Sequence, residues 1–186
     1  MTTPLDKPHH YLIRDLFLFS CYTGILYSNM CKLTEEELEL APDGELWIKT
    51  SRVKTGMEYD LPLLDIPLQI LERYRGIADE ERLLPMYSNS ELSRELKTVA
   101  RTCGINRRIT FHQGHHTYAS EITLSQGVPI ETVSRMLGHG QIKPTQIYAK
   151  ITNDKTAEDM KALDDRICGK FKFAIYYPKN FDYGNE

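Results

Sequence analysis

Apolar positions recur at helical spacing in several separate segments, and this pattern predicts most of the fold. The segment from Tyr11 to Tyr22 places large apolar side chains on more than one face, which is typical of a buried helix, and Gly24 follows as its C-cap. Later segments carry a single apolar stripe and predict helices exposed on one side. One predicted helix spans residues 67–75, and the next runs from Ser88 or Ser90 to Gly104. Three shorter helices are expected to begin at Phe111, Pro129 and Pro144, and a final helix to cover residues 154–167.

Terminal residues set the expected limits of the later helices. Thr110 and Gln113 have the spacing of a capping box, which predicts a helix start between them. Pro129 suits the first position of the next helix, and Gly138 suits its C-cap. The short helix that follows is expected to include Tyr148, one turn from its start.

Between residues 38 and 63 the period changes from helical spacing to alternation. Apolar residues occupy every second position at 38 and 40, at 46 and 48, and at 59 and 61. AspGly at 43–44 and ThrGly at 55–56 are typical of tight turns between strands. The pattern predicts a three-stranded antiparallel sheet, so the fold class is α+β and mainly α-helical.

Length and composition indicate one domain of ordinary size. The chain has 186 residues, of which 41% are hydrophobic and 26% charged, values typical of a globular protein. Residues 1–10 form a polar lead-in, residues 11–168 the predicted domain, and residues 169–186 a tail rich in apolar and aromatic side chains. The tail is expected either to pack on its own domain or to dock on a neighbouring molecule.

The sequence indicates neither membrane insertion nor secretion. It has no run of about 18 apolar residues and no signal-peptide pattern at its start. The four cysteines show no paired metal spacing and are too sparse for a disulfide framework. Free thiols in a reducing compartment are expected, and with them a cytoplasmic protein.

Charge is distributed unevenly, although the net charge is only −3. Residues 101–150 hold six basic and two acidic residues, a local charge of +4, so the remainder carries −7. A basic segment on an acidic body fits a surface that contacts phosphate. It fits an accident of composition equally well, so charge alone does not identify a nucleic-acid-binding protein.

Four of the six histidines lie between residues 112 and 139. His112 falls in the first turn of a predicted helix, where unpaired backbone N–H groups and the helix dipole attract anions. His115 and His116 follow at i+3 and i+4 and share its side of the helix. These three residues are also a candidate zinc site. However, no Glu follows His112 as a His-Glu-x-x-His motif requires, and no carboxylate lies at ligand spacing, so no metal is expected.

Three short motifs in this region resemble the catalytic motifs of the tyrosine recombinases, the phage-integrase-type enzymes that break and rejoin DNA. They are HisGlnGlyHisHisThr from His112, LeuGlyHisGly around His139, and TyrAlaLys from Tyr148. The resemblance runs in the family's order from about Leu12 to Leu163. It implies the family's fold, a mainly helical catalytic domain with a small antiparallel sheet.

The resemblance also implies a chemistry, in which a tyrosine attacks the DNA phosphodiester and forms a 3′-phosphotyrosyl intermediate. It assigns Tyr148 as the nucleophile and Lys54, on the predicted hairpin, as the acid for the leaving 5′-oxygen. His112 and His139 would position the phosphate and assist proton transfer. The implied partner is double-stranded DNA at the bacterial nucleoid, with self-association on DNA and no metal or small-molecule cofactor. The expected DNA-binding face also includes basic residues of the +4 segment, Arg135 and Lys143.

Two positions depart from the family pattern, which has two phosphate-binding arginines. In the motif at residues 23–29, Leu26 stands at the first arginine position, which is also not arginine in the branch carried on conjugative transposons. His115 stands at the second, and an imidazole cannot reproduce the bidentate fork of a guanidinium. Arg52, two residues before Lys54, is a candidate replacement. A recombinase of weakened or lost activity is therefore expected; the alternative is an inactive DNA-binding relative in which His115 is an inert, hydrogen-bonded residue.

Overall fold

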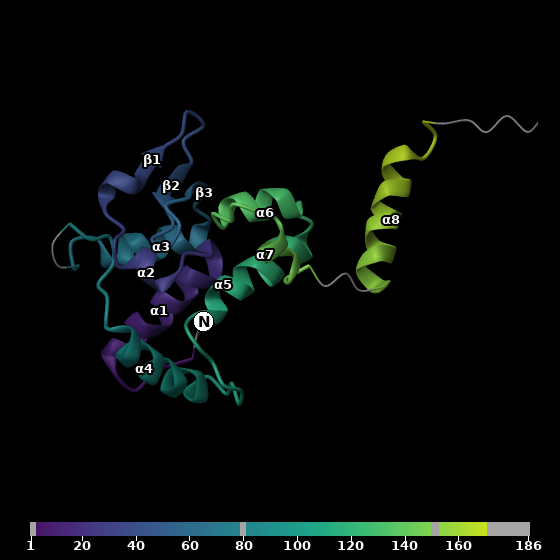
Figure 1. Ribbon diagram of the computed structural model, residues 1–186. Helices are drawn as coiled ribbons and strands as arrows, with labels where there is room; N and C mark the ends of the chain where they lie inside the picture. Colours follow the sequence, from purple (N-terminus) through teal and green to yellow (C-terminus); the bar gives the residue numbers. More distant parts are fainter. Residues whose placement is uncertain (1–2, 79–80, 150–152, 171–186) are drawn as a thin grey trace, which may run out of the picture. The chain divides into compact units, whose positions relative to one another are not determined.

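The computed structural model describes residues 3–78, 81–149 and 153–170. It divides into two compact units, Met1–Lys150 and Ile151–Glu186. The first unit holds the sheet and helices α1 to α7 (Figure 1). The second holds α8, Asn153–Ile167, where the sequence predicts the final helix. Among the described residues, no helix combines the length and apolar character that crossing a membrane requires.

Helix α1, Pro8–Thr23, is the central element of the first unit. It begins earlier than the apolar period predicts, because Pro8 suits the first helical position. It ends at Gly24, whose φ of 71° lets its N–H donate to the Ser20 carbonyl at 2.9 Å. Three further helices pack against it: α3 (Asp65–Tyr74), α4 (Asn89–Thr102) and α5 (Gln113–Thr117).

A buried carboxylate ties α3 to α1. Asp15 is only 2% exposed, and it accepts hydrogen bonds from Arg73 Nη1 at 2.7 Å and from the Tyr74 hydroxyl at 2.8 Å. A carboxylate without such donors would be costly to bury. The last turn of α3 is therefore fixed against the first half of α1.

The predicted three-stranded antiparallel sheet is confirmed. Its order is β1 (Leu38–Leu40), β2 (Leu46–Ser51) and β3 (Glu58–Pro62). Ile48 and Leu61 are opposite each other and both fully buried, so the alternating pattern marks the face toward the core. The turn between β2 and β3 is closed by the Arg52 N–H, which donates to the Met57 carbonyl at 2.8 Å.

The helix that carries three of the histidines begins later than predicted. α5 starts at Gln113 instead of Phe111, because residues 110–112 form a turn. Within this turn the Gln113 side chain accepts from the Thr110 N–H at 2.7 Å, which is one of the two hydrogen bonds of a capping box. His112 is consequently the N-cap of α5.

The placement of Tyr148 inside a helix is wrong. α7, Lys143–Gln146, ends before it, and the Tyr148 N–H donates to the Thr145 carbonyl at 3.0 Å. This i to i−3 bond belongs to a tighter turn than an α-helix makes. Pro129 likewise precedes α6, Ile130–Met136, as its N-cap. The remaining short elements are α2 (Tyr27–Met30), η1 (Glu35–Glu37), η2 (Tyr118–Thr123) and η3 (Leu124–Gln126).

Two groups of buried apolar side chains stabilise the first unit. The larger group joins α1, the sheet, α3 and α4, and includes the fully buried Leu16 and Phe19. The smaller group lies between η2 and α6 and consists of Tyr118, Ala119, Val133 and Leu137. α6 also contacts both β3 and α7, as Figure 1 shows, so the segments that carry the candidate residues converge beside the sheet.

The predicted tail, residues 169–186, lies almost wholly outside the described residues. Only Gly169 and Lys170 are described, and Gly169 has a φ of 74° just after α8. This left-handed conformation fits the predicted end of the final helix at Gly169.

Candidate functional site

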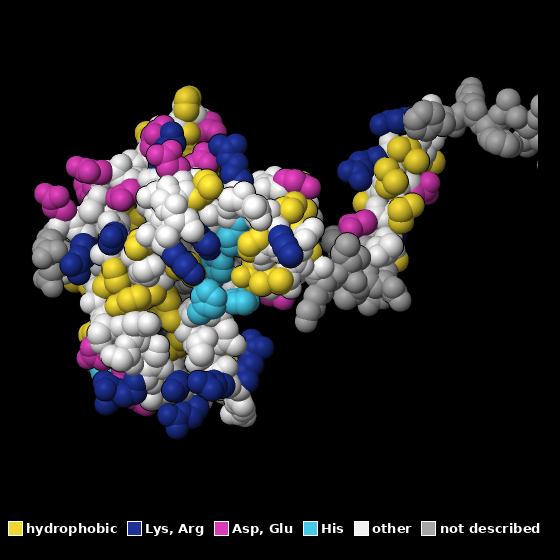
Figure 2. Space-filling view, viewed as in Figure 1, with side chains coloured by type: hydrophobic (Ala, Val, Ile, Leu, Met, Phe, Trp, Pro, Cys, Tyr) yellow, Lys and Arg dark blue, Asp and Glu magenta, His cyan; other side chains and the backbone are white. Residues whose placement is uncertain are grey.

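Five aromatic side chains from three separate segments meet in the first unit, and we call them the histidine–tyrosine cluster. His112, His115 and His116 come from the start of α5, His139 from the loop after α6, and Tyr148 from the turn after α7. Ring centroids lie 5.6 Å apart for His112 and His115, 5.8 Å for His115 and His139, and 5.0 Å for His116 and Tyr148. Figure 2 shows histidine side chains gathered at the centre of one face, with Lys and Arg side chains around them.

A close helix contact positions α5. Gly114 packs against Ser20 of α1 so tightly that a Cβ at Gly114 would come 2.6 Å from the Ser20 hydroxyl oxygen. Only a residue without a side chain allows this approach. The contact carries His115, the next residue, into the interior, where it is 2% exposed. His112 remains exposed at the N-cap.

His115 is held by the backbone at the end of α1. Its Nδ1 lies 2.6 Å from the carbonyl oxygen of Gly24. Burial lowers the pKa of His115 to about 4; the Gly24 hydrogen bond opposes this shift, and the positive charge of Arg52 adds to it. His115 is therefore neutral at physiological pH. The motif at residues 23–29 thus contributes a carbonyl acceptor to the cluster.

His139 is presented by a left-handed glycine and held by a threonine. Gly138 has a φ of 62°, and a Cβ there would come 2.7 Å from the Tyr59 ring, so glycine is required on both counts. His139 Nδ1 lies 2.7 Å from the hydroxyl oxygen of Thr145, which is fully buried. Burial first, and the charge of Arg52 second, lower the pKa of His139 to about 4.

Tyr148 is half-buried against the histidines. Its ring centroid lies 6.1 Å from that of His115, and the two rings are nearly perpendicular at 76°. Burial raises the pKa of Tyr148, and the charge of Arg52 opposes that rise. A nearby cation therefore stabilises the phenolate form, which is the nucleophilic form of tyrosine.

Arg52 is the cation that acts on the cluster as a whole. Its charge lowers the pKa of His112, of buried His115 and of half-buried His139, and it opposes the rise in the pKa of Tyr148. The side chain is half-buried and lies beside Gly138, where its Cγ would be 3.1 Å from an added Cβ. Burial lowers the pKa of Arg52 itself, although guanidinium remains charged at any physiological pH. The structure thus brings Arg52 to the cluster from the start of the β2–β3 turn.

Comparison with known proteins identifies the family. Residues 1–155 match the Phage integrase family. The chain belongs to the phage integrase family. The tyrosine recombinase of Pseudothermotoga lettingae is 27% identical over 165 residues, which cover 86% of this chain and 55% of that protein. The tyrosine recombinase XerA of Pyrococcus furiosus is 30% identical over 159 residues, which cover 80% of this chain and 52% of that protein. This phage integrase family member thus spans about half the length of the curated relatives it matches.

Solved structures of tyrosine recombinases share its fold. The XerH site-specific recombinase, in its post-cleavage complex with difH substrate, aligns with a TM-score of 0.65 at 14% identity, over 86% of this chain and 48% of that one. The Tn1549 transposon integrase, in complex with a circular intermediate DNA, aligns with a TM-score of 0.60 at 17% identity. The alignment covers 84% of this chain and 60% of the integrase chain. The predicted tyrosine-recombinase-like fold is confirmed.

Four residues singled out from the sequence lie apart from the ring contacts of the cluster. Lys54 is exposed in the β2–β3 turn, and Lys143 is exposed at the start of α7. Arg135 is exposed on α6 and pairs with Asp60, with 3.3 Å between Nη2 and Oδ1. Leu26 is half-buried at the N-cap of α2 and offers no polar side-chain atom. Neither Leu26 nor neutral His115, the two positions at which the resemblance expects an arginine, therefore offers a cation.

The sequence reasoning missed several groups that support the site. The Gly24 carbonyl and the Thr145 hydroxyl each hold a histidine, and no local pattern connects these partners, which meet only after folding. His116 was assigned to the helix start but to no chemical role, although its ring lies close to Tyr148.

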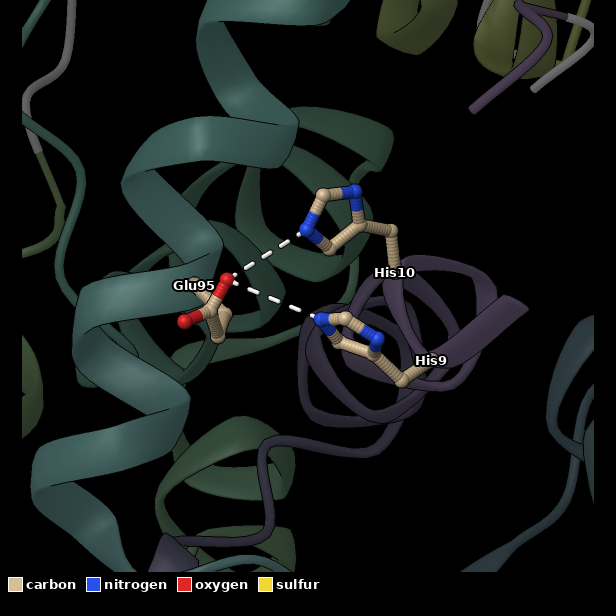
Figure 3. A group of neighbouring side chains, drawn as sticks. All are labelled: His9, His10 and Glu95. Carbon is tan, nitrogen blue, oxygen red and sulfur yellow. Dashed lines mark hydrogen bonds and ion pairs between the residues drawn. The ribbon is translucent and has the colours of Figure 1, made fainter. Parts of the chain in front are cut away.

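A second group of candidate metal ligands lies elsewhere in the first unit (Figure 3). His9 and His10, at the start of α1, point toward Glu95 of α4, and one ligand atom from each lies within 4.8 Å of the others. His10 Nε2 is 3.3 Å and His9 Nε2 is 3.7 Å from the same carboxylate oxygen. Two histidines and a carboxylate are a common ligand set for transition metals.

The surroundings of His10 fit a neutral hydrogen bond to Glu95 better than a metal site. A histidine that binds metal through Nε2 carries its proton on Nδ1 and normally donates it to a carbonyl, carboxylate or water. His10 Nδ1 is buried and has no partner among the described residues, so metal binding would strand a buried N–H. If instead Nε2–H donates to Glu95, Nδ1 is left with only a lone pair. We assign the three residues to the packing of α1 against α4.

Proposed function

We propose that the chain is the catalytic domain of a site-specific DNA recombinase that cleaves and rejoins DNA through Tyr148. In the forward step the Tyr148 oxygen bonds to phosphorus, the phenol loses its proton, and the bond to the 5′-oxygen breaks as that oxygen gains a proton. The reverse attack by the 5′-hydroxyl rejoins the strand. The covalent link conserves the energy of the phosphodiester, so the step needs no nucleotide cofactor.

One observation carries this proposal: Tyr148, a half-buried tyrosine, packs against two histidines in the field of Arg52. Burial raises the pKa of Tyr148, and the charge of Arg52 opposes that rise, so Arg52 is the group in the site that favours the nucleophilic phenolate. The solved structures with this fold add support, because XerH was captured with its difH substrate before and after cleavage. The Tn1549 integrase was likewise captured with circular intermediate DNA.

Arg52 supplies phosphate-binding charge in this proposal, and the rate is lower than in relatives with two arginines. Leu26 donates nothing, and neutral His115 does not offer two charged N–H groups. Loss of one preorganised donor of this kind costs about 2.7–4 kcal/mol, or roughly a hundred- to a thousandfold in rate. The same two replacements favour the second candidate function, a DNA-binding relative that does not cleave.

The proposed DNA-binding face surrounds the cluster. It includes His112, His139, Lys54 and Lys143, with Arg135 at its edge because Asp60 partly neutralises that guanidinium. The anion seat predicted at the helix start stays a prediction, and α5 continues directly into the helical segment η2 behind it. Exposed basic side chains of α4 and of the loop that follows are candidates to extend the face: Arg94, Lys97, Arg101, Arg107 and Arg108.

Self-association on DNA is part of the proposal and is assigned to the second unit. On α8, Met160, Leu163 and Ile167 recur at i, i+3 and i+7, which places apolar side chains along one side of the helix. An amphipathic helix of this kind is suited to a groove on another molecule.

Covalent trapping tests the proposed function. Pooled duplexes with a random central sequence and a nick near the cleavage position are incubated with the wild type and with Tyr148→Phe. We expect a denaturation-resistant adduct with the wild type only, attached through Tyr148, and equal non-covalent binding by both proteins. Tyr87→Phe is the matched control and should retain the adduct. Binding by both proteins with no adduct from either would favour the DNA-binding relative.

A further inference from the structure

The hydrogen bond of His115 to the backbone decides which of its nitrogens carries the proton. The Gly24 carbonyl oxygen can only accept, so the hydrogen in the 2.6 Å contact belongs to Nδ1. Because His115 is 2% exposed and its pKa is lowered to about 4, the ring is neutral near pH 7. A neutral imidazole with its proton on Nδ1 has a bare lone pair on Nε2.

The lone pair changes what this position can do. An arginine here would donate two hydrogen bonds to phosphate oxygens, whereas bare Nε2 can only accept one. A phosphate oxygen cannot donate a proton to Nε2, whereas a tyrosine hydroxyl can. The Tyr148 ring is nearly perpendicular to the His115 ring, with 6.1 Å between centroids. Among the described residues no direct hydrogen bond joins the two side chains, so the proton would pass through one intervening water or after a small side-chain rotation.

We propose that His115 is the base that accepts the Tyr148 proton, so that the family's second arginine position has changed from a phosphate donor to a proton acceptor. This inference rests on the proposed function. The Nε2 lone pair takes the phenolic proton while the tyrosine oxygen uses the freed electron pair to bond to phosphorus, and the bond to the 5′-oxygen breaks. The 5′-oxygen takes its proton from a separate donor, for which Lys54 is the candidate. The resulting imidazolium has an N–H on each nitrogen, so Nε2 can then donate to the charged phosphorane, and it returns its proton to Tyr148 in the reverse step.

For the other histidines of the cluster, the structure does not fix which ring nitrogen could accept a proton. The partner of His139 Nδ1 is the Thr145 hydroxyl, which can donate or accept, so either tautomer of His139 fits. His116 has the ring nearest to Tyr148, at 5.0 Å, and is the main competitor for the role. The charged, titratable and polar groups that face His115 are the Gly24 carbonyl of α1, Arg52 of the β2–β3 turn, His112 and His116 of α5, His139 and Tyr148.

A test without DNA measures the reactivity of Tyr148 directly. Benzenesulfonyl fluoride converts a tyrosine to its sulfonate ester with loss of fluoride and of the phenolic proton, and peptide mass spectrometry gives the rate at Tyr148. With His115 as base, we expect the wild-type rate to change little between about pH 6 and pH 9. In His115→Gln and His115→Ala the rate should instead rise roughly tenfold per pH unit, as free tyrosinate forms. The loss should be at least about a hundredfold near pH 6, and added imidazole should restore part of it in His115→Ala.

Two controls separate this role from a structural one. A loss that is equal at every pH would mean that His115 only supports the site, and would overturn the proposal. If the sulfonylation rate at Tyr148 showed the pH-dependent loss in His116→Gln and not in His115→Gln, the base would be His116. Nitrogen-15 NMR of the wild type checks the tautomer without any variant: a proton on Nε2 rather than Nδ1 at neutral pH overturns the inference.

The same variants on nicked duplexes distinguish failure of the inference from failure of the proposed function. Adduct formation by His115→Gln with the pH profile of the wild type would leave the recombinase intact and remove His115 as base. The expected reactivity toward benzenesulfonyl fluoride, with no DNA adduct from the wild type at any pH, would remove the recombinase function. The same result would show that His115 accepts the Tyr148 proton but that the pair does not cleave DNA, which contradicts the proposal.

Discussion

At the scale of single residues, the proposed chemistry depends on Leu26 and His115, which stand where the resemblance expects arginines, and on Arg52. His115 is buried and neutral, and Leu26 is half-buried and apolar, so neither offers the charge that a phosphorane needs. Arg52 supplies a charge from a different segment, the β2–β3 turn. One guanidinium in place of two leaves part of the developing phosphate charge without a donor.

Restoring one arginine should therefore raise cleavage. In Leu26→Arg we expect the rate of adduct formation on a nicked duplex to increase by about a hundred- to a thousandfold, because the new guanidinium lies beside the Gly24 carbonyl that holds His115. Leu26→Met keeps the volume without the charge and should behave as the wild type. An unchanged rate in Leu26→Arg, with DNA binding intact, would show that Arg52 already satisfies the phosphate.

Neutral histidines also make stability depend on pH. His115 and His139 have folded pKa values of about 4 against a usual value of 6.5, so the unfolded chain binds more protons between these limits. Their contribution is complete above about pH 6.5 and is lost as pH falls toward 4. It reaches up to about 3 kcal/mol for His115, and less for half-buried His139 after solvent screening.

Urea denaturation at about pH 7 and pH 4.5 measures this dependence. The wild type should lose more unfolding free energy on acidification than His115→Gln, in which position 115 no longer titrates. Equal losses in the two proteins would mean that His115 is already protonated in the folded state.

Close packing at glycines is what assembles the site at the scale of elements. Gly114 brings α5 onto α1, and Gly24 lies where α1 meets Tyr118 and Leu137 of the smaller core. A Cβ at Gly24 would come 2.5 Å from the Tyr118 ring and 2.8 Å from the Leu137 side chain. The end of α1 is therefore both a helix cap and the contact that orients the histidine-bearing segments.

A pair of glycine variants separates these two roles. Gly24 and Gly104 both have positive φ, 71° and 75°, but a Cβ at Gly104 would have no atom within 4 Å. Gly104→Ala should cost about 1 kcal/mol from backbone strain alone. Gly24→Ala should cost a further ~1–3 kcal/mol from overpacking. Equal losses in urea denaturation would mean that the surrounding side chains move aside without cost.

At the scale of the whole molecule, we propose that folding and association belong to different units. Residues 1–150 form one compact unit that contains the sheet, both core groups and the histidine–tyrosine cluster. Residues 151–186 form a unit of their own, with the apolar stripe of α8. The first unit contains both groups of buried apolar side chains, so the proposal assigns stability to it and association to the second unit.

Truncation after residue 150 tests this division. We expect the unfolding temperature to change by less than about 4 °C, the shift that corresponds to roughly 1 kcal/mol for a unit of this size. Self-association on duplex DNA, measured by analytical ultracentrifugation, should fall, whereas binding of the first molecule should persist and weaken with salt. Removing only residues 171–186, the end of the predicted tail, is the graded control. A large drop in unfolding temperature would show that the second unit packs on the first.

Local patterns in the sequence determined the elements, the family and the residue types of the site. Alternation at residues 46–48 and 59–61 marked the strands, and helical spacing marked α1, α3, α4 and α8, because both periods express which side of an element faces apolar surroundings. The order of the motifs around His112, His139 and Tyr148 indicated the family, which the match over residues 1–155 confirmed. Helix limits were less certain, since a cap such as Thr110 can close a turn as well as a helix.

Only the tertiary structure decided how those residues work together. The Gly24 carbonyl fixes the tautomer and orientation of His115, and the Thr145 hydroxyl holds the orientation of His139. The charge of Arg52 acts on both histidines from a turn far away in the chain. Hydrogen bonding, burial and charge at His115 depend on neighbours 91 residues apart, so no local pattern contains them. A histidine at an arginine position reads as a loss in the sequence, whereas in the folded protein its ring is buried and anchored to the backbone, and this arrangement is what carries the proposed role as a base.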